Sequence, residues 1–295
     1  MTSILTGDYS KTRALAHVIS LDTVSSTNDY AAQLVSNGQF SRDGVTVVFA
    51  QTQTAGRGRL DHTWMSAPGK SFIGSFISAV NADLAKNPKL NGWLQMIAGL
   101  SVIDALRHTV AHTNLEWRNE AGGMRNDVLL KWPNDIVYHG MKLGGILAQL
   151  VQLPNDSSTM AVIFGVGLNL DVSPAELPTP ESTSLQLVTQ CTPGTAFPPV
   201  RMLADYIAAS TVQGLEKRLW EFGMHPDTYA QDLHKRVLEE CWTLGKAIVV
   251  HYADGTTQLG VARTINSDAS LTMTDDSNKP HIVQTADVGV LPVEL

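Results

Sequence analysis

The most informative stretch of the sequence is QTAGRGR, residues 53–59. It follows residues 45–50, an apolar run with the composition of a buried strand. Its two glycines let main-chain N–H groups approach a ligand, and its two arginines supply permanent positive charge in a planar form that suits carboxylate or phosphate. A Gly-Arg-Gly-Arg tetrapeptide is also typical of an exposed basic turn. This stretch alone therefore leaves an anion site and a surface loop both open.

Strand-like and helix-like segments extend outward from this stretch along most of the chain. Short apolar runs typical of strands are residues 18–24, 45–50, 72–80, 128–132, 144–151 and 161–170. Apolar residues at helical spacing are found at residues 28–35, 93–110 and 200–222. The two kinds of segment do not alternate strictly, so the pattern predicts an α+β domain with a mixed or largely antiparallel sheet.

The C-terminal segment has a different pattern. From Lys246 onward, strand-like runs at residues 247–252, 258–265, 271–274 and 282–284 are separated by turn sequences. Short strands with such turns are typical of a small β-barrel. We therefore predict a larger domain over residues 1–245 and a small β-barrel domain over residues 246–295.

The composition argues against a protein that mainly binds nucleic acid. The 295 residues contain 21 Lys and Arg against 28 Asp and Glu, for a net charge of −7, whereas phosphate binding needs clustered cations. Cys191 and Cys241 fall in no disulfide or metal-ligand pattern, which favours a reducing cytoplasm. The sequence has neither a signal-like start nor an apolar run of the roughly 20 residues that span a bilayer.

Four further motifs carry polar residues or glycines at the ends of predicted elements. They are Ser25-Ser26-Thr27-Asn28, Lys131-Trp132-Pro133-Asn134-Asp135, Lys142-Leu143-Gly144-Gly145-Ile146-Leu147 and Gly165-Val166-Gly167-Leu168-Asn169. Each also has an ordinary structural interpretation, namely a helix cap, a turn, a hairpin and a glycine-relieved strand. The second motif could in addition offer charge, an aromatic ring and a carboxylate for Mg²⁺ around one ligand.

In chain order, the five motifs resemble the signature of bacterial biotin protein ligases, in the form without an N-terminal DNA-binding domain. The resemblance implies a catalytic domain related to class II aminoacyl-tRNA synthetases and lipoate ligases, over residues 1–245, followed by an SH3-like β-barrel. It implies that biotin and ATP, with Mg²⁺, give biotinyl-5'-AMP and pyrophosphate. A lysine of a biotin carboxyl carrier domain of a biotin-dependent carboxylase then accepts the biotin.

The resemblance also assigns roles to individual residues. The implied biotin contacts are Ser26, Thr27, Asn28, Gln53, Arg57, Gly58, Arg59, Lys142 and Gly145. The implied ATP contacts are Arg57, Arg59, Trp64, Lys131, Asn134 and Asn169. Arg59, Lys142 and Asp135 are the implied catalytic residues, and Asp135 is the implied Mg²⁺ ligand. Joining a carboxylate to a triphosphate brings like charges together, so such a site depends on positioned cations.

Departures from the family pattern lead to further expectations. Leu60-Asp61-His62 stand where the family often has another glycine and arginine, so we expect this loop to close differently. About 25 residues precede Ser26, too few for a winged helix, so we expect no DNA binding. Residues 116–126 are predicted to be an exposed insertion.

Two other functions stay open at this point. The first is a lipoate or octanoate protein ligase of the same fold. Transfer through a cysteine nucleophile would need a recognisable thiol site, and Cys191 lies in a loop-like sequence. The second is a regulator that binds the adenylate without transferring it. A homodimer is likewise left open by the sequence.

Overall fold

A seven-stranded mixed sheet forms the centre of the larger part of the chain. The computed structural model describes residues 9–60, 62–118, 127–284 and 286–291. In spatial order the strands are β1 (His17–Val24), β2 (Thr46–Gln53), β3 (Ser71–Asn81), β8 (Asp156–Asn169), β7 (Met141–Leu153), β6 (Asp135–Tyr138) and β5 (Val128–Lys131). The pair β1–β2 is parallel and the other pairs are antiparallel. The prediction of a mixed sheet is confirmed.

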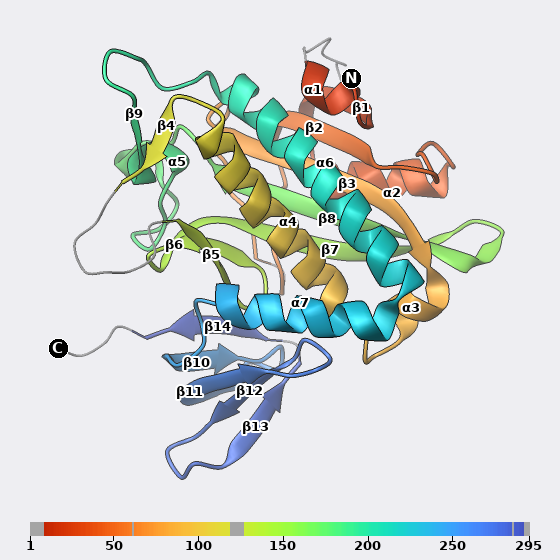
Figure 1. Ribbon diagram of the computed structural model, residues 1–295, viewed down its shortest axis with the longest axis vertical. Helices are drawn as coiled ribbons and strands as arrows, with labels where there is room; N and C mark the ends of the chain where they lie inside the picture. Colours follow the sequence, from red (N-terminus) through yellow and green to blue (C-terminus); the bar gives the residue numbers. More distant parts are fainter. Residues whose placement is uncertain (1–8, 61, 119–126, 285, 292–295) are drawn as a thin grey trace.

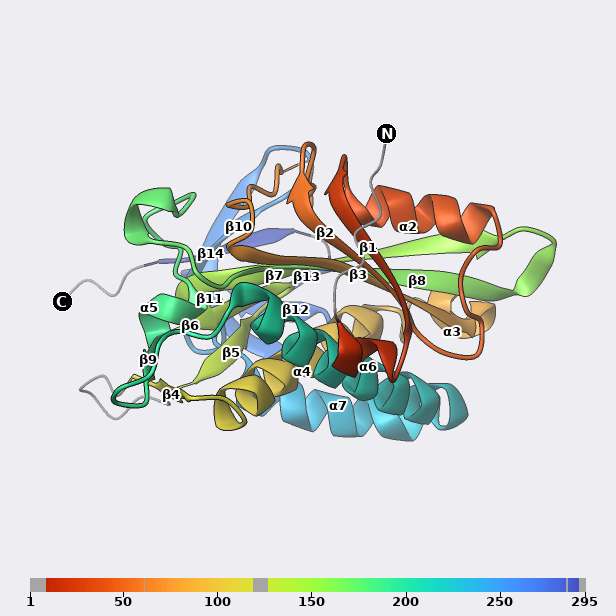
Figure 2. The same ribbon diagram turned by 90° about the horizontal axis from the view of Figure 1, so that it is seen from above.

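Helices cover both faces of this sheet (Figures 1 and 2). On one face lie α4 (Gly92–Ala111), α6 (Val200–Met224) and α7 (Pro226–Glu240), and on the other lies α2 (Thr27–Ser36). Short helices α1 (Ser10–Arg13), α3 (Ala82–Lys86) and α5 (Leu185–Val188) and the 3₁₀ turn η1 (Pro174–Glu176) complete the layers. Because both faces are covered, most residues of β3 and of the second half of β8 are buried on both sides.

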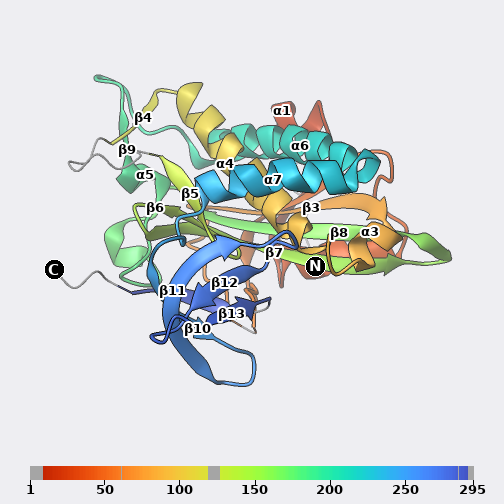
Figure 3. The ribbon, with the colours of Figure 1, turned by 60° about the horizontal axis from the view of Figure 1, so that its bottom comes forward.

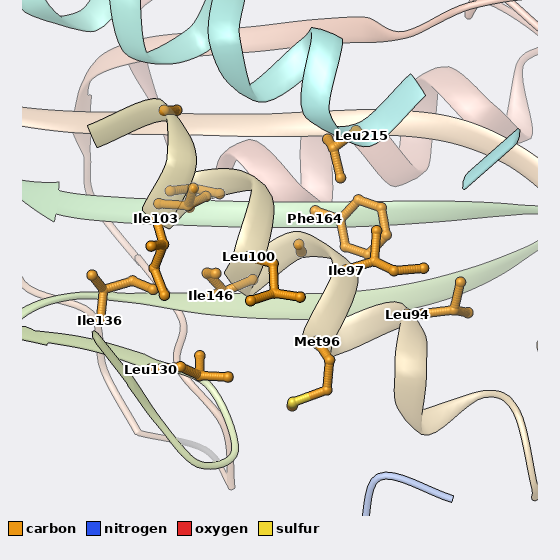
Figure 4. Packing of buried hydrophobic residues seen from close by; sticks show 14 of the residues in the cluster. Leu94, Met96, Ile97, Leu100, Ile103, Leu130, Ile136, Ile146, Phe164 and Leu215 are labelled. Carbon is orange, nitrogen blue, oxygen red and sulfur yellow. The ribbon is translucent and has the colours of Figure 1, made fainter. Parts of the chain in front are cut away.

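The main hydrophobic core lies between the sheet and α4. Figure 4 shows Leu94, Ile97 and Leu100 of α4 facing Phe164 of β8 and Ile146 of β7. All five side chains are buried. Burying a side chain of this size stabilises the fold by about 1.5–3 kcal/mol, so this helix is a principal anchor of the sheet.

Ion pairs join the three helices on this face. Asp104 of α4 binds both Arg218 of α6 and Arg236 of α7. Arg107 of α4 makes a bidentate contact with the buried Glu240 of α7, with N–O distances of 2.8 and 2.7 Å. Paired geometry of this kind satisfies the charges that the helices bring together.

A separate five-stranded antiparallel sheet follows α7 (Figure 3). Its strands are β10 (Ala247–His251), β11 (Thr257–Ile265), β12 (Leu271–Thr274), β13 (Pro280–Val283) and β14 (Asp287–Val290), in the order β13-β12-β11-β10-β14. It packs against the larger part through two indole N–H groups. Trp93 donates to the carbonyl of Ser267 and Trp132 to that of Ala269, each at 2.9 Å. These bonds fix the C-terminal sheet relative to the β5–β6 turn.

The sequence-based prediction is wrong at the start of the proposed insertion. β4 (Leu115–Trp117) pairs with β9 (Thr189–Cys191), so residues 116 and 117 belong to a strand. The Trp117 ring stacks 5.9 Å from the Tyr138 ring. Long-range pairing with a segment some seventy positions later is not visible in the local sequence. Residues 119–126 lie outside the described residues.

Candidate active site

The residues singled out from the sequence line one cavity of about 770 Å³. This volume falls within the range of about 300–1,000 Å³ that is typical of small-molecule sites. Those residues are Ser26, Thr27, Asn28, Gln53, Arg57, Gly58, Arg59, Trp64, Lys131, Asn134, Asp135, Lys142, Gly145 and Asn169. The register explains part of this grouping, since Asp135 of β6 lies opposite Gly145 of β7, which lies opposite Gly167 of β8.

A neutral polar cradle forms one end of the cavity, at the start of α2. Gln53 Oε1 accepts from Thr27 N at 2.8 Å and from Thr27 Oγ1 at 3.1 Å. Ser75 Oγ lies 2.7 Å from Asn28 Oδ1, and Asn28 Nδ2 donates to the carbonyl of Leu147 at 3.2 Å. These contacts fix amide and hydroxyl groups that can both donate and accept, as a neutral polar ligand requires.

Two serines support the residues of the cradle. Ser26 is the N-cap of α2 and accepts from Asp29 N at 3.4 Å. Ser75, fully buried on β3, bonds to both Thr27 and Asn28 from behind the cavity wall, and the sequence analysis missed this supporting residue. The only local signal was a hydroxyl residue inside the apolar run of β3.

Residues 56–60 and 62–64 form a small hairpin, which we call the Gly-Arg hairpin. Gly58 N donates to His62 O at 2.6 Å and Trp64 N donates to Gly56 O at 2.9 Å. A Cβ at Gly56 would lie 2.5 Å from the Trp64 carbonyl oxygen. Here the glycine is required because the two arms of the hairpin approach closely, and the Gly58 amide is already bonded within the hairpin.

The two arginines of the hairpin have different surroundings. Arg57 forms an ion pair with Asp29 of α2, and its side chain is half exposed. Within the described residues, the Arg59 guanidinium makes one weak hydrogen bond, to Asn134 Oδ1 at 3.4 Å. Burial lowers the pKa of the Arg59 guanidinium, although the nearby charges of Asp287 and Asp135 oppose this effect. A partly buried guanidinium with a weak neutral partner is well suited to receive an anionic ligand.

Two lysines converge on one carboxylate inside the cavity. Lys142 Nζ lies 2.8 Å from Asp135 Oδ1, and Lys131 Nζ lies 3.5 Å from Asp135 Oδ2. The backbone of Lys142 is held by two bonds, from its N to the Glu181 carbonyl at 2.7 Å and from Thr183 N to its carbonyl at 2.8 Å. Lys142 therefore has a fixed backbone and a partly exposed ammonium group.

The same carboxylate is the one acidic group that the sequence offered for Mg²⁺. Across the described ranges there is no cluster of three or more His, Cys, Asp or Glu side chains able to hold a metal. Mg²⁺ is usually held by one or two carboxylates together with substrate phosphates and water. The Asp135 carboxylate lines the cavity and would serve as such a single ligand where Mg²⁺ displaces one of its two lysine partners.

Trp64 occupies a slot made by glycines of the interior strands β7 and β8. A Cβ at Gly167 would overlap its indole ring, and a Cβ at Gly145 would lie 3.6 Å from it. The Trp64 indole N–H is buried and has no hydrogen-bond partner in the part of the chain that the structure describes. Lys142 Nζ lies 5.8 Å from the centre of the ring. The ring thus lines the cavity wall, while its N–H points into the packed slot.

Several further lining residues were not found from the sequence. The C-terminal sheet contributes His251, Tyr252 and Asp287, and the segment before Thr183 contributes Thr179 and Ser182. None of them belongs to a short motif, and only the packing of the C-terminal sheet brings the first three to the cavity. His62, which departs from the family pattern, lies with its Nε2 3.0 Å from Asp287 Oδ2.

No helix in the described part of the molecule has the length and apolar character needed to cross a membrane.

Comparison with known proteins places the fold and the motifs in one family. The model of the biotin/lipoate A/B protein ligase family matches residues 20–169. A Mycobacterium tuberculosis protein named biotin--[acetyl-CoA-carboxylase] ligase is 31% identical over 271 residues, which cover 91% of this chain and 88% of that protein. The bifunctional ligase/repressor BirA of Bacillus subtilis is 33% identical over 162 residues, 55% of this chain and 43% of that protein.

Solved structures agree on the fold. The Aquifex aeolicus biotin protein ligase, in complex with biotin and ATP, has a TM-score of 0.68 and 20% identity, and covers 93% of this chain and 99% of that one. The match of the family model and the nearly full-length similarity to the mycobacterial ligase establish that the chain belongs to the biotin/lipoate A/B protein ligase family.

Proposed function

We propose that the protein is an ATP-dependent biotin protein ligase, which makes biotinyl-5'-AMP and transfers the biotin to a lysine of a biotin carboxyl carrier domain. The mycobacterial relative that aligns along most of both chains is named as such a ligase. The observation that carries the proposal is the layout of the cavity, in which the neutral cradle of Thr27, Asn28 and Gln53 lies beside the cations Arg59 and Lys142. A biotin molecule has a neutral urea ring and a carboxylate tail, which match these two ends.

In the first step, a carboxylate oxygen of biotin attacks the α-phosphorus of ATP, and the bond to the pyrophosphate group breaks. Both reactants are negatively charged, so cations must hold them together. Arg59 and Lys142 bind the carboxylate and the α-phosphate, while Lys131, Asn134 and Asn169 hold the nucleotide and Trp64 covers it. Asp135 would hold Mg²⁺, which would supply additional neutralisation of the phosphate charge.

In the second step, the amine of the acceptor lysine attacks the biotinyl carbonyl carbon, and AMP leaves with the bonding electron pair. Arg59 and Lys142 stabilise the charge that returns to the AMP phosphate. Asp135 lines the cavity, and its carboxylate contacts the incoming lysine in place of one of the two lysines that it pairs with here. Arg57, paired with Asp29, binds at the periphery of the same phosphate and carboxylate site.

A lipoate or octanoate ligase of the same fold is the second candidate, since the family includes lipoate ligases. Transfer through a cysteine nucleophile requires a thiol at the cavity. Neither Cys191 nor Cys241 is among the residues that line it. Burial also raises the pKa of the Cys241 thiol, which keeps it in the less reactive protonated form.

We further propose that the chain divides into a catalytic domain over residues 1–245 and an SH3-like β-barrel domain over residues 246–295. The five-stranded C-terminal sheet supports this division. The two free cysteines support a reducing, cytoplasmic compartment.

The test is transfer of labelled biotin to a carrier domain in the presence of ATP and Mg²⁺. We expect one lysine of the carrier to be labelled, and we expect no labelling when that lysine is replaced by arginine. Labelling of the carrier with lipoate but not with biotin would favour the second candidate.

A further inference from the structure

The contact between His62 and Asp287 joins two parts of the cavity wall that come from opposite ends of the sequence. His62 belongs to the Gly-Arg hairpin, and Asp287 is the first residue of β14. Their side chains approach to 3.0 Å between Nε2 and Oδ2. His62 is 70% exposed and Asp287 is 30% exposed, so the pair lies at the rim of the cavity. Asp287 is itself held in the sheet, where it pairs with His251 of β10.

The position of His62 within the hairpin makes this contact relevant to ligand binding. The carbonyl of His62 accepts the Gly58 amide at 2.6 Å, and its own amide donates to the Arg59 carbonyl at 3.0 Å. A tether on His62 therefore restrains the backbone on both sides of Arg59. Asp287 also contributes a negative charge near the Arg59 guanidinium.

We propose that Asp287 is a positioning residue, which binds His62 and so holds the Gly-Arg hairpin against the C-terminal sheet. This contact slows dissociation of the bound adenylate. The inference rests on the proposed function. Neither residue carries out the chemistry. The other ion pair of the hairpin, Arg57 with Asp29, attaches it to α2. With both contacts made, the hairpin is bound to α2 on one side and to the C-terminal sheet on the other. The C-terminal sheet therefore helps to hold the ligand in the site.

The expected effect is modest, because exposed ion pairs contribute little. Loss of such a pair should speed adenylate release about twofold to fivefold. The variants are His62→Gln, Asp287→Asn, the double variant and His62→Arg in the full chain. His62→Arg supplies an N–H donor to Asp287 from this position and should release adenylate at the rate of the unchanged protein. Asp276→Asn, which removes a carboxylate from the turn between β12 and β13, is the matched control.

The measurement is the rate at which preformed labelled biotinyl-5'-AMP dissociates when it is chased with unlabelled adenylate. We expect the two single variants to be faster and the double variant to be no faster than the faster single one, because both remove the same contact. The proposal would be overturned if the rate increases of the two single variants multiplied in the double variant. It would also be overturned if His62→Arg released the adenylate as fast as His62→Gln. A tether that acts by positioning should change this release rate more than kcat of adenylate formation.

A second measurement does not depend on the proposed activity. Hydrogen exchange of the Gly58 amide in the ligand-free protein reports opening of the hairpin. We expect faster exchange in His62→Gln and in Asp287→Asn, with no change in Asp276→Asn. If the Gly58 amide exchanged at the same rate in these two variants as in the original protein, the tether would be refuted. This conclusion would hold even if the original protein formed no adenylate. Failure of the proposed function is thereby separated from failure of this inference.

Discussion

Gly165 of β8 lies directly against the side-chain amide of Asn28 of α2, so that a Cβ at residue 165 would overlap the Asn28 oxygen. The amide is held in this place by Ser75 Oγ at 2.7 Å and by the carbonyl of Leu147 at 3.2 Å. Gly165 is therefore required because the neighbouring Asn28 side chain leaves no room for a Cβ. Gly167 makes the same kind of room for the Trp64 indole.

The first prediction concerns this contact. Gly165→Ala should push the Asn28 amide out of the cradle and break its bonds to Ser75 and Leu147. Loss of a hydrogen bond of this kind costs about 0.5–1.5 kcal/mol, so KM for biotin should rise about threefold to tenfold, with KM for ATP little changed. The measurement is steady-state kinetics with each substrate varied in turn.

A glycine in open surroundings provides the control for that experiment. Gly223 lies in α6 with nothing within 4 Å of a Cβ placed there. Gly223→Ala should leave both KM values unchanged and should slightly stabilise the helix. An unchanged KM for biotin in Gly165→Ala would show that Asn28 does not contact biotin.

The second prediction concerns Arg59. Replacing it by glycine removes the partly buried guanidinium that we assign to the carboxyl and phosphate groups of the adenylate. Arg59→Gly should therefore release biotinyl-5'-AMP into solution, where it would biotinylate unrelated lysines. The measurement is labelling of a bystander protein, with Arg42→Gly as the control. Arg42 is exposed, pairs with Asp156 and is not among the residues that line the cavity. Labelling confined to the carrier domain would contradict the role of Arg59.

The third prediction separates the two lysines that share Asp135. Removal of a positioned charge that acts on the transition state lowers kcat by about 10²–10³-fold, and we expect this for Lys142→Met. Lys131→Met should instead mainly raise KM for ATP, because we assign Lys131 to the nucleotide. Single-turnover adenylate formation measures both. The assignment fails if the two variants lose kcat to the same extent.

The fourth prediction concerns the stability in acid of the segment around Glu176. This segment precedes Glu181 and Thr183, which bond to the backbone of Lys142. Glu176 accepts from Lys70 Nζ at 2.6 and 2.7 Å and from Ser173 Oγ at 2.6 Å. The bond from Lys70, followed by that from Ser173, lowers the pKa of Glu176 from 4.5 to about 2. A depressed pKa contributes stability that is present above the ordinary value and is lost as the pH falls through the lowered one.

Urea unfolding of Glu176→Gln and of the unchanged protein tests this assignment. The difference between their midpoints should be largest above pH 4.5 and should shrink as the pH falls toward about 2. The site is exposed, so the difference should be small at every pH. A midpoint difference that is equal at pH 6 and pH 3 would contradict the assignment.

The local elements of the fold could be predicted from the sequence because their signals are local. Residues 93–110 have apolar side chains at helical spacing, and α4 spans Gly92–Ala111. The helix α7 was missed because its polar surface leaves only a few buried positions, such as Leu233 and Val237. β14 was missed because Asp287–Val290 is short and contains a glycine.

From the sequence, only those site residues that belong to the ordered motifs could be predicted. Asn28, Arg59, Lys142 and their companions carry a recognisable pattern in the chain, and they do line one cavity. Asp287 carries no such pattern. It reaches the cavity because Trp93 and Trp132 bond to the backbone of the C-terminal sheet, a contact between distant segments that no local rule predicts.

The central claim is that this cavity activates biotin with ATP. Biotin-dependent exchange of labelled pyrophosphate into ATP measures that step directly and needs no carrier domain. It should be run in parallel with biotin, lipoate and octanoate at equal concentrations. We predict exchange with biotin and none above background with the other two acids, whereas exchange with lipoate but not with biotin would contradict the account.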